Sequence, residues 1–219
     1  SNNFINLVFN FFFITIIING SNFIDGLNGL LAGYSILILV SILYLSSNQL
    51  NLFSPNDVFL KFYLFSLLIF LLFNFSGHVY LGDSGSYLLS MFLCFLLIKI
   101  YMINQFLSPY YFAALLWYPA FENLFSFVRR SISKKKISLA DNLHFHQLFF
   151  VFIKKKNILS INYINSFCSV VILLLNLPGF IVSNLYPTKT IILVFIIILN
   201  VTVYLSLYYF FLKALKNNE

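Results

Sequence analysis

The segment HVYLGDSGSYLL, His78 to Leu89, places a carboxylate among glycines and serines between two long apolar runs. An ionisable group at membrane depth is costly, and it marks a functional site by default. Glycine and serine at a helix start favour phosphate oxygens, because free N–H groups and the positive end of the helix dipole face them. We therefore predict that Asp83 holds a cation that in turn holds a phosphate. The alternative is that Asp83 only caps a helix.

A second polar stretch, NGSNFIDGLNGL, repeats amide and carboxylate side chains every three residues, at Asn19, Asn22, Asp25 and Asn28. This spacing keeps the four groups along one stripe of a helix end. Amide oxygens together with a carboxylate suit a hard cation such as Mg²⁺. The glycines between them allow a ligand or another backbone to approach closely. The alternative is a polar helix cap with small residues at a helix–helix contact.

The third stretch, ADNLHFHQLFF, holds His144 and His146 two residues apart, with Asp141 just before them. Histidines at this spacing do not share a face of a regular helix, so they point together only where the backbone is extended or irregular. A zinc site lacks ligands here, because no cysteine is near. A histidine pair that binds phosphate or hydroxyl groups is favoured over polar residues of an interfacial loop. Glu122, near the inner end of the preceding apolar run, is a further candidate for the same cleft.

These motifs belong to a chain that is otherwise apolar. Of its 219 residues, 61% are hydrophobic and 9% are charged. Its apolar runs approach or exceed the length of about 20 residues that spans a bilayer. They cover residues 4–18, 27–46, 58–76, 86–103, 108–128, 161–183 and 188–212. The sequence therefore predicts an all-α polytopic transmembrane bundle of about seven membrane segments. It forms a single domain over residues 1–219, and the two cysteines show no disulfide or metal spacing.

The basic residues predict how the bundle is oriented. Eight of the thirteen lysines and arginines fall in the loop 129–160, which the positive-inside rule assigns to the cytoplasm. Counting membrane crossings from this loop assigns the loops 19–26 and 77–85 to the same side. We therefore expect all three polar motifs at one cytoplasmic face. The sequence starts at Ser1 and its first apolar run is short, so we also expect that an N-terminal part of the protein precedes this sequence.

With the three motifs in this order, the chain resembles the polyprenyl-phosphate N-acetylhexosamine-1-phosphate transferases. These are the bacterial glycosyltransferase family 4 proteins, which include lipid I synthase and the O-antigen-initiating transferases. The family patterns N-x-x-N-x-x-D-G-x-[DN]-G-L, G-D-x-G-S and H-x-H-[HQ] match NGSNFIDGLNGL, LGDSGS and HFHQ. Asn28 stands where aspartate is frequent, and Gln147 where histidine is frequent. Both features resemble the O-antigen-type subgroup, as does the segment WYPAFENLFSFVRR before the histidines.

The resemblance implies a reaction. An N-acetylhexosamine 1-phosphate would move from a UDP-sugar to undecaprenyl phosphate, which gives an undecaprenyl-diphospho-sugar and UMP and initiates a cell-surface polysaccharide. The implied cofactor is Mg²⁺, with Mn²⁺ as a substitute, and the implied location is the bacterial inner membrane with the active site facing the cytoplasm. The partners are the two substrates and membrane lipids, without nucleic acid, and a homodimer is left open. An acidic motif of the family belongs upstream of Asn19, so this segment alone is expected to be inactive.

Individual residues take their roles from the same resemblance. Asp83 matches the family's Mg²⁺-binding aspartate, and Asn22 matches its second metal-contacting position. Asp25, Asp83, His144 and His146 are the catalytic candidates, and we expect Asn22, Asp25, Asp83 and His144 to converge within about 10–12 Å around one metal–diphosphate group. The substrate-binding candidates are Asn19, Asn28, Gly82, Ser84, Gly85 and Ser86.

Two other functions are retained as alternatives. One is a phospho-MurNAc-pentapeptide transferase of the lipid I synthase type. The other is a secondary transporter, which would place its carboxylates near the middle of the bilayer. The three motif aspartates are instead expected at one surface.

Overall fold

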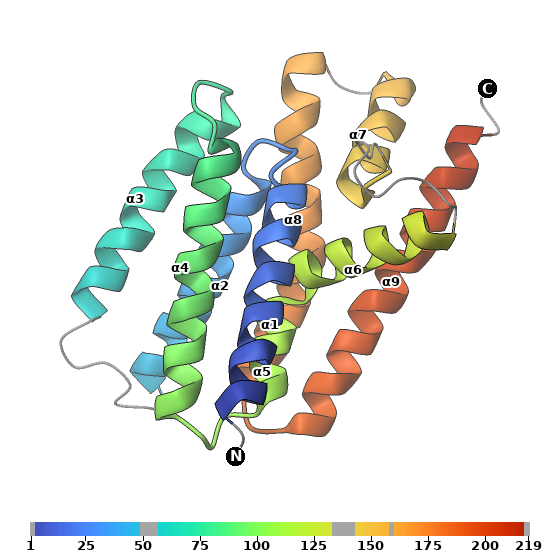
Figure 1. Cartoon of the computed structure of the whole chain (residues 1–219). Helices are drawn as coiled ribbons and strands as arrows, with labels where there is room; N and C mark the ends of the chain where they lie inside the picture. Colours follow the sequence, from blue (N-terminus) through green and yellow to red (C-terminus); the bar gives the residue numbers. More distant parts are fainter. Residues whose placement is uncertain (1–2, 49–56, 133–142, 158–159, 217–219) are drawn as a thin grey trace.

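A computed structural model describes residues 3–48, 57–132, 143–157 and 160–216 (Figure 1). The described residues form helices and connecting loops, and they contain no strand. The helices are α1 (Asn3–Ile24), α2 (Leu30–Asn48), α3 (Asp57–Phe75), α4 (Gly82–Ile103), α5 (Pro109–Leu115), α6 (Trp117–Ile132), α7 (Phe145–Lys156), α8 (Ile161–Leu185) and α9 (Thr190–Lys216).

Five of these helices are long and apolar enough to cross a membrane, namely α2, α3, α4, α8 and α9. A shorter apolar stretch, Asn10–Ile24, lies in α1. The predicted all-α polytopic bundle is therefore confirmed. Both cysteines are free and buried in this bundle, which agrees with the absence of disulfide spacing.

The apolar run 108–128 was expected to form one membrane segment, and this expectation is wrong. The structure divides the run into α5 and α6, which differ in direction at Leu116 (Figure 1). The physical cause is Pro119, which has no N–H to donate to the carbonyl of Leu115, four residues earlier, and whose ring clashes with it. That carbonyl instead accepts a hydrogen bond of 2.9 Å from the Tyr34 hydroxyl. The long helix is thus replaced by a short upright helix and a helix that crosses the bundle.

The three motif segments lie at one end of the bundle, the upper end in Figure 1. The turn 25–29, the loop 76–81 and the start of α7 are found there, whereas the connections 104–108 and 186–189 lie at the opposite end. This arrangement agrees with the predicted count of crossings. Asp141 and Lys134–Lys136 lie outside the described residues.

The first motif helix, α1, is held between α4 and α6. A Cβ added to Gly20 would lie 1.9 Å from the carbonyl oxygen of Pro119, so the backbones of α1 and α6 are in direct contact there. Beside this contact, the Asn123 amide donates to the Ile16 carbonyl at 3.0 Å. The glycine of the first motif thus lets α1 pack closely on α6, and the end of α1 is fixed where the other motifs meet it.

Candidate active site

A pocket of about 320 Å³ opens at the motif end of the bundle. Its walls come from the end of α1 with the turn that follows it, and from the loop that leads into α4. Asn22, Asp25 and Asn28 line one side, and Gly82 and Asp83 line the other. Two motifs that are separated by more than 50 residues in the sequence therefore share one pocket, as expected.

The electrostatics of the pocket are dominated by two carboxylates. Burial, and to a smaller extent the negative charge of Asp83, together raise the pKa of Asp25 to about 7. No group of three or more histidine, cysteine, aspartate or glutamate side chains gathers to hold a metal in the part of the chain that the structure describes. The groups at this pocket that could ligate a cation are thus two carboxylates with amide oxygens beside them.

A buried amide, Asn74, joins the two walls of the pocket. Its Oδ1 accepts from the N–H of Gly29 in the first wall, and its Nδ2 donates to the carbonyl of Val79 in the second wall at 2.6 Å. On the first wall, the N–H of Asn28 donates to Oδ1 of Asn165 at 2.7 Å. Asn74 was not singled out in the sequence. The signal that identifies it is an amide inside an apolar run, because an unpaired amide is costly in a membrane.

The side chain of Asn22 is oriented by α4. The Ser86 hydroxyl donates to Asn22 Oδ1 at 2.8 Å and lies 2.9 Å from the carbonyl oxygen of Asp83. The Asn22 Nδ2 group donates to the Tyr87 hydroxyl at 3.3 Å. Ser86 is fully buried and contacts Asn22, so its observed role is to position that amide beside Asp83.

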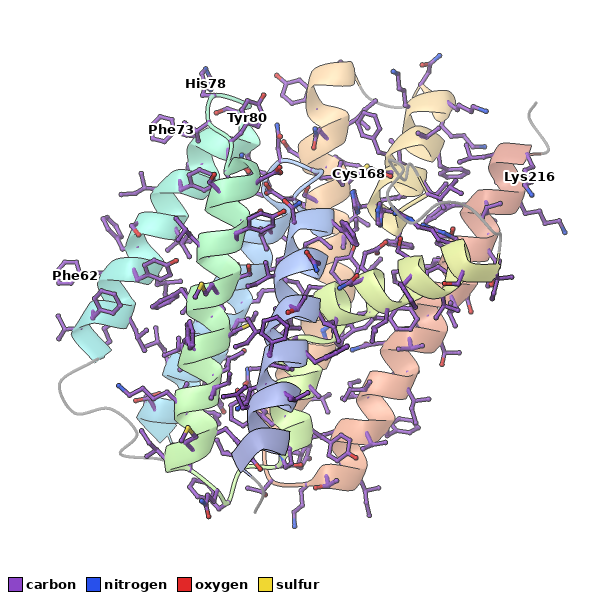
Figure 2. The ribbon with its side chains drawn as sticks, viewed as in Figure 1. Phe62, Phe73, His78, Tyr80, Cys168 and Lys216 are labelled. Atoms are coloured by element: carbon purple, nitrogen blue, oxygen red, sulfur yellow. The ribbon has the colours of Figure 1, made fainter. Side chains whose placement is uncertain are left out.

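The remaining substrate-binding candidates differ in their placement. Gly82 begins α4 with a φ of +63°, a conformation that glycine adopts without strain, and an added Cβ would meet nothing within 4 Å. A Cβ added to Gly85, in the first turn of α4, would lie 3.2 Å from the side chain of Leu81 just before that helix. Asn19 and Ser84 are exposed and do not line the pocket. His78, at the tip of the loop, also points away from the bundle (Figure 2).

The histidine motif is organised by Glu122, which is fully buried. Its Oε1 accepts from Nδ1 of His144 at 2.9 Å and from the N–H of Phe145 at 3.3 Å, and its Oε2 accepts from the Tyr204 hydroxyl at 2.8 Å. His144 has extended backbone dihedrals just before α7, and its ring stacks on that of His146 with centroids 5.7 Å apart. The two rings come together because the backbone is irregular there, as the spacing predicts.

His144 does not line the 320 Å³ pocket, and its expected convergence with Asn22, Asp25 and Asp83 stays a prediction. It is buried, and its ring lies 4.8 Å from the ring of Phe23 near the end of α1. The reason is the bond to Glu122, which holds the imidazole toward α6. Gln147, one of the motif positions, accepts a hydrogen bond of 3.3 Å from the N–H of His144 and so caps α7.

His146 is the residue of the third motif that reaches the pocket wall. A Cβ added to Gly26 would lie 2.6 Å from its Nε2 atom. His146 is fully buried, and neither ring nitrogen has a hydrogen-bond partner among the described residues. Burial lowers its pKa to about 4, although the nearby Glu122 carboxylate acts in the opposite direction. The ring is therefore neutral at pH 7, and the glycine of the first motif leaves room for it.

Comparison with known proteins shows similarity to one family over part of the chain. Residues 1–101 match the family model for glycosyl transferase family 4. The chain is 32% identical over 140 residues to a probable undecaprenyl-phosphate N-acetylglucosaminyl 1-phosphate transferase of Bacillus subtilis (strain 168). The aligned segment covers 62% of this chain and 38% of that protein. The chain is 34% identical over 134 residues to an undecaprenyl-phosphate alpha-N-acetylglucosaminyl 1-phosphate transferase of Thermotoga maritima. This second alignment covers 60% of this chain and 39% of that protein.

The chain thus spans about two fifths of the length of these curated relatives. No solved structure is significantly similar to it. The matched region contains the first two motifs and both walls of the pocket. The chain is thus similar to glycosyl transferase family 4 over residues 1–101, and to the two named transferases over 140 and 134 residues.

Proposed function

We propose that the protein of which this chain is part transfers an N-acetylhexosamine 1-phosphate from a UDP-sugar to undecaprenyl phosphate. The products are an undecaprenyl-diphospho-sugar and UMP, and the reaction initiates a cell-surface polysaccharide. The observation that carries this proposal is the pocket in which Asn22 and Asp25 face Gly82 and Asp83. The names of the two relatives support undecaprenyl phosphate as the acceptor and N-acetylglucosamine 1-phosphate as the transferred group.

The oxygen ligands that the pocket offers fit Mg²⁺, the cofactor of the proposed reaction. This ion keeps several waters and binds proteins through one or two carboxylates plus substrate phosphates, so two carboxylates are sufficient. Burial and the nearby Asp83 charge raise the pKa of Asp25, so both disfavour its ionised form, and a bound cation would offset this. Asp83 and Asn22 would hold the ion, with Asp25 beside them. When bound, Mg²⁺ offsets the negative charge that builds up as one phosphate attacks another.

The protein groups around the pocket have complementary tasks. The first N–H groups of α4, at Gly82 and Asp83, have no partner within the helix and are suited to phosphate oxygens. Asp25, whose carboxylate lines the same pocket, would accept a proton from the attacking phosphate. The position at one end of an apolar bundle gives the lipid phosphate access from the bilayer and gives the nucleotide access from water.

The proposed orientation has the pocket on the cytoplasmic side. Basic side chains of the described residues gather at the motif end, at Arg129 and Arg130 of α6, at Lys154–Lys156 of α7, and at the end of α9, where Figure 2 shows Lys216. The positive-inside rule favours the cytoplasm for such an end. A UDP-sugar, which is a cytoplasmic metabolite in the proposed reaction, would then reach the pocket directly.

The test is the substitution Asp83→Asn in the full-length protein. The amide keeps the size and one oxygen but loses the negative charge that binds a hard cation. We expect UMP release from UDP-N-acetylglucosamine and undecaprenyl phosphate to fall at least about a hundredfold across a Mg²⁺ titration, as the loss of several kcal/mol of electrostatic stabilisation implies. The matched control is Asp57→Asn, the same change at the first residue of α3, at the other end of the bundle.

If Asp83 only capped α4, asparagine would serve almost equally well. Turnover of the Asp83→Asn protein at the level of the unmodified protein would therefore overturn the assignment. Thermal unfolding of both variants shows whether the bundle remains folded.

A further inference from the structure

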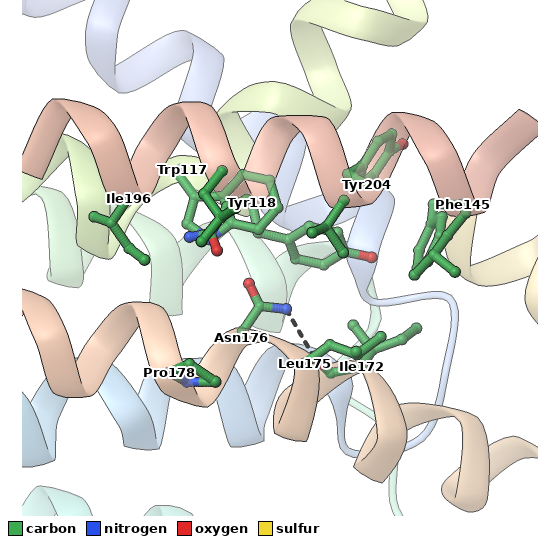
Figure 3. Close-up of a pocket in the computed structure, with 13 residues that line it drawn as sticks. Trp117, Tyr118, Phe145, Ile172, Leu175, Asn176, Pro178, Ile196 and Tyr204 are labelled. Carbon is green, nitrogen blue, oxygen red and sulfur yellow. Dashed lines mark hydrogen bonds between the residues drawn. The ribbon is translucent and has the colours of Figure 1, made fainter.

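The helix α8 contacts two separate regions of the bundle. Its middle lines a pocket of about 240 Å³, in which Ile172 and Asn176 of α8 lie with Trp117 of α6 and side chains of α9 (Figure 3). Near its start, the side chains of Asn165 and Ser166 instead bond to backbone groups at the motif end. Both residues are half-buried and lie outside the three sequence motifs, so the sequence predicts no role for them.

Two consecutive N–H groups of the first motif donate to side-chain amides from outside the motifs. The N–H of Asn28 donates to Oδ1 of Asn165 at 2.7 Å. The N–H of Gly29, the next residue, donates to Oδ1 of Asn74. These N–H groups belong to the two peptide groups that flank the Cα atom of Asn28, a residue that lines the carboxylate pocket. The two bonds therefore fix the backbone on both sides of Asn28, and with it the direction of its side chain.

The second wall of the pocket is held by the same set of side chains. Nδ2 of Asn74 donates to the carbonyl of Val79 at 2.6 Å, in the loop that leads to Asp83. The Ser166 hydroxyl donates to the carbonyl of Phe75 at 2.6 Å, at the end of α3 where this loop begins. Adjacent residues of α8 thus bond to the first wall and to the helix end from which the second wall starts.

The two asparagines differ in which of their atoms are used. Asn74 is 6% exposed, and both ends of its amide are bonded, the oxygen to the first wall and the nitrogen to the second. Asn165 contributes its oxygen to the first wall. An amide oxygen and an ionised carboxylate both accept from an N–H, but the carboxylate cannot donate. A change of asparagine to aspartate therefore preserves the bond made by Asn165 and breaks one bond made by Asn74.

We propose that Asn165 is a positioning residue of the transfer reaction, an inference that rests on the proposed function. It is not among the residues that line the pocket, and it acts through the backbone of Asn28. By holding this turn, it keeps Asp25 in place in the pocket that Asp83 shares. A misplacement of about 1 Å can cost about a hundredfold in rate, so a single bond to the turn affects catalysis.

The bond itself is tested by amide hydrogen exchange on the full-length protein, resolved to single residues by mass spectrometry. This measurement needs no substrate, so it does not depend on the proposed function. Asn165→Leu keeps the size of the side chain and removes the acceptor, and Asn165→Ala removes the acceptor without adding an apolar group. We expect the N–H of Asn28 to exchange about tenfold faster in both variants, because a hydrogen bond protects it in the unmodified protein. In Asn165→Asp its exchange should not become faster.

The role in transfer is tested by the rate of UMP release from UDP-N-acetylglucosamine and undecaprenyl phosphate. We expect kcat to fall about tenfold to a hundredfold in Asn165→Leu and to recover in Asn165→Asp. Asn74→Asp adds the same charge but loses the donor to Val79, so its kcat should fall and not recover. Recovery at one position and not at the other is not expected from a general loss of stability.

The matched control is Asn104→Leu. The Asn104 amide donates to the carbonyl of Ile100 at 3.0 Å, at the opposite end of the bundle. This variant should leave both kcat and the exchange of the Asn28 N–H unchanged.

Two results would overturn the inference. One is unchanged exchange of the Asn28 N–H in both Asn165→Leu and Asn165→Ala. The other is faster exchange with an unchanged kcat, which would make the bond structural only. An unmodified protein that releases no UMP would refute the proposed function and with it the role of Asn165 in transfer, while the exchange result still decides whether the bond exists.

Discussion

Glu122 gives the sharpest prediction about stability, because a fully buried carboxylate holds the histidine motif in place. It accepts hydrogen bonds from the side chain of His144, from the backbone of Phe145 and from the hydroxyl of Tyr204. These partners belong to α7 and α9 and to the segment before α7, whereas Glu122 belongs to α6. Removing the carboxylate therefore leaves three buried donors on other elements without an acceptor.

The expected magnitudes follow from these bonds. Glu122→Ala removes all three bonds and one partner of a buried pair, so we expect a loss of about 3–5 kcal/mol in the free energy of unfolding. Glu122→Gln keeps an oxygen for His144 and Phe145, and its amino group can donate to the oxygen of Tyr204. Only the negative charge is then lost, and we expect the free energy of unfolding to fall by about 1.5–3 kcal/mol. Tyr204→Phe removes a single bond and should cost less than Glu122→Ala.

The assay is reversible unfolding of the detergent-solubilised protein, followed by circular dichroism. A double-mutant cycle with Glu122→Ala and His144→Ala measures the interaction between these two residues directly, because groups in one hydrogen-bonded network are not additive. We expect the double variant to be more stable than the sum of the single losses predicts. Additive losses, or a Glu122→Ala protein within about 0.5 kcal/mol of the unmodified one, would refute the reasoning.

Three further predictions follow from the motif end. Gly26→Ala should strongly reduce the rate of transfer while the bundle still folds, because the new Cβ would lie 2.6 Å from Nε2 of His146. Transfer kinetics together with thermal unfolding of the variant test this, and a normal turnover rate contradicts it. The pKa of Asp25 is about 7 in the folded protein and far lower in the unfolded protein, so the free energy of unfolding should rise as the pH falls from 8 to 6.5. The variant Asp25→Asn should abolish this rise, and a rise that persists in the variant refutes the prediction. Tyr80 and Phe106 are 69% and 52% exposed, and the two native cysteines are buried. The variants Tyr80→Cys and Phe106→Cys should therefore react with membrane-impermeant thiol reagents from opposite sides of the membrane, Tyr80→Cys from the cytoplasm. Labelling of both from one side would contradict the count of crossings.

The sequence predicts much of the motif end for a physical reason. Polar groups in an apolar chain are costly, so runs such as the one around Asp25 and the one around Asp83 stand out, and the number of crossings between them determines their side of the membrane. The break at Leu116 was missed because residues 108–128 are apolar almost throughout, although Pro119 is a visible signal. The pairing of Glu122 with His144 is a tertiary contact, and the spacing within one motif does not contain it.

The contacts made by the start of α8 have a consequence for whether the part of the chain that matches the family model can be separated from the rest. Oδ1 of Asn165 accepts from the N–H of Asn28, and the hydroxyl of Ser166 donates to the carbonyl of Phe75 at 2.6 Å. Both supporting side chains lie beyond residue 101, where the match to the family model ends, yet they hold the turn at Asn28 and the end of α3, which the matched part contributes. The matched part is therefore not an autonomous building block. A chimera that joins residues 1–101 to the C-terminal half of another protein would inherit the motifs without these supports, and its success would depend on whether the new partner offers an amide and a hydroxyl at the same two places.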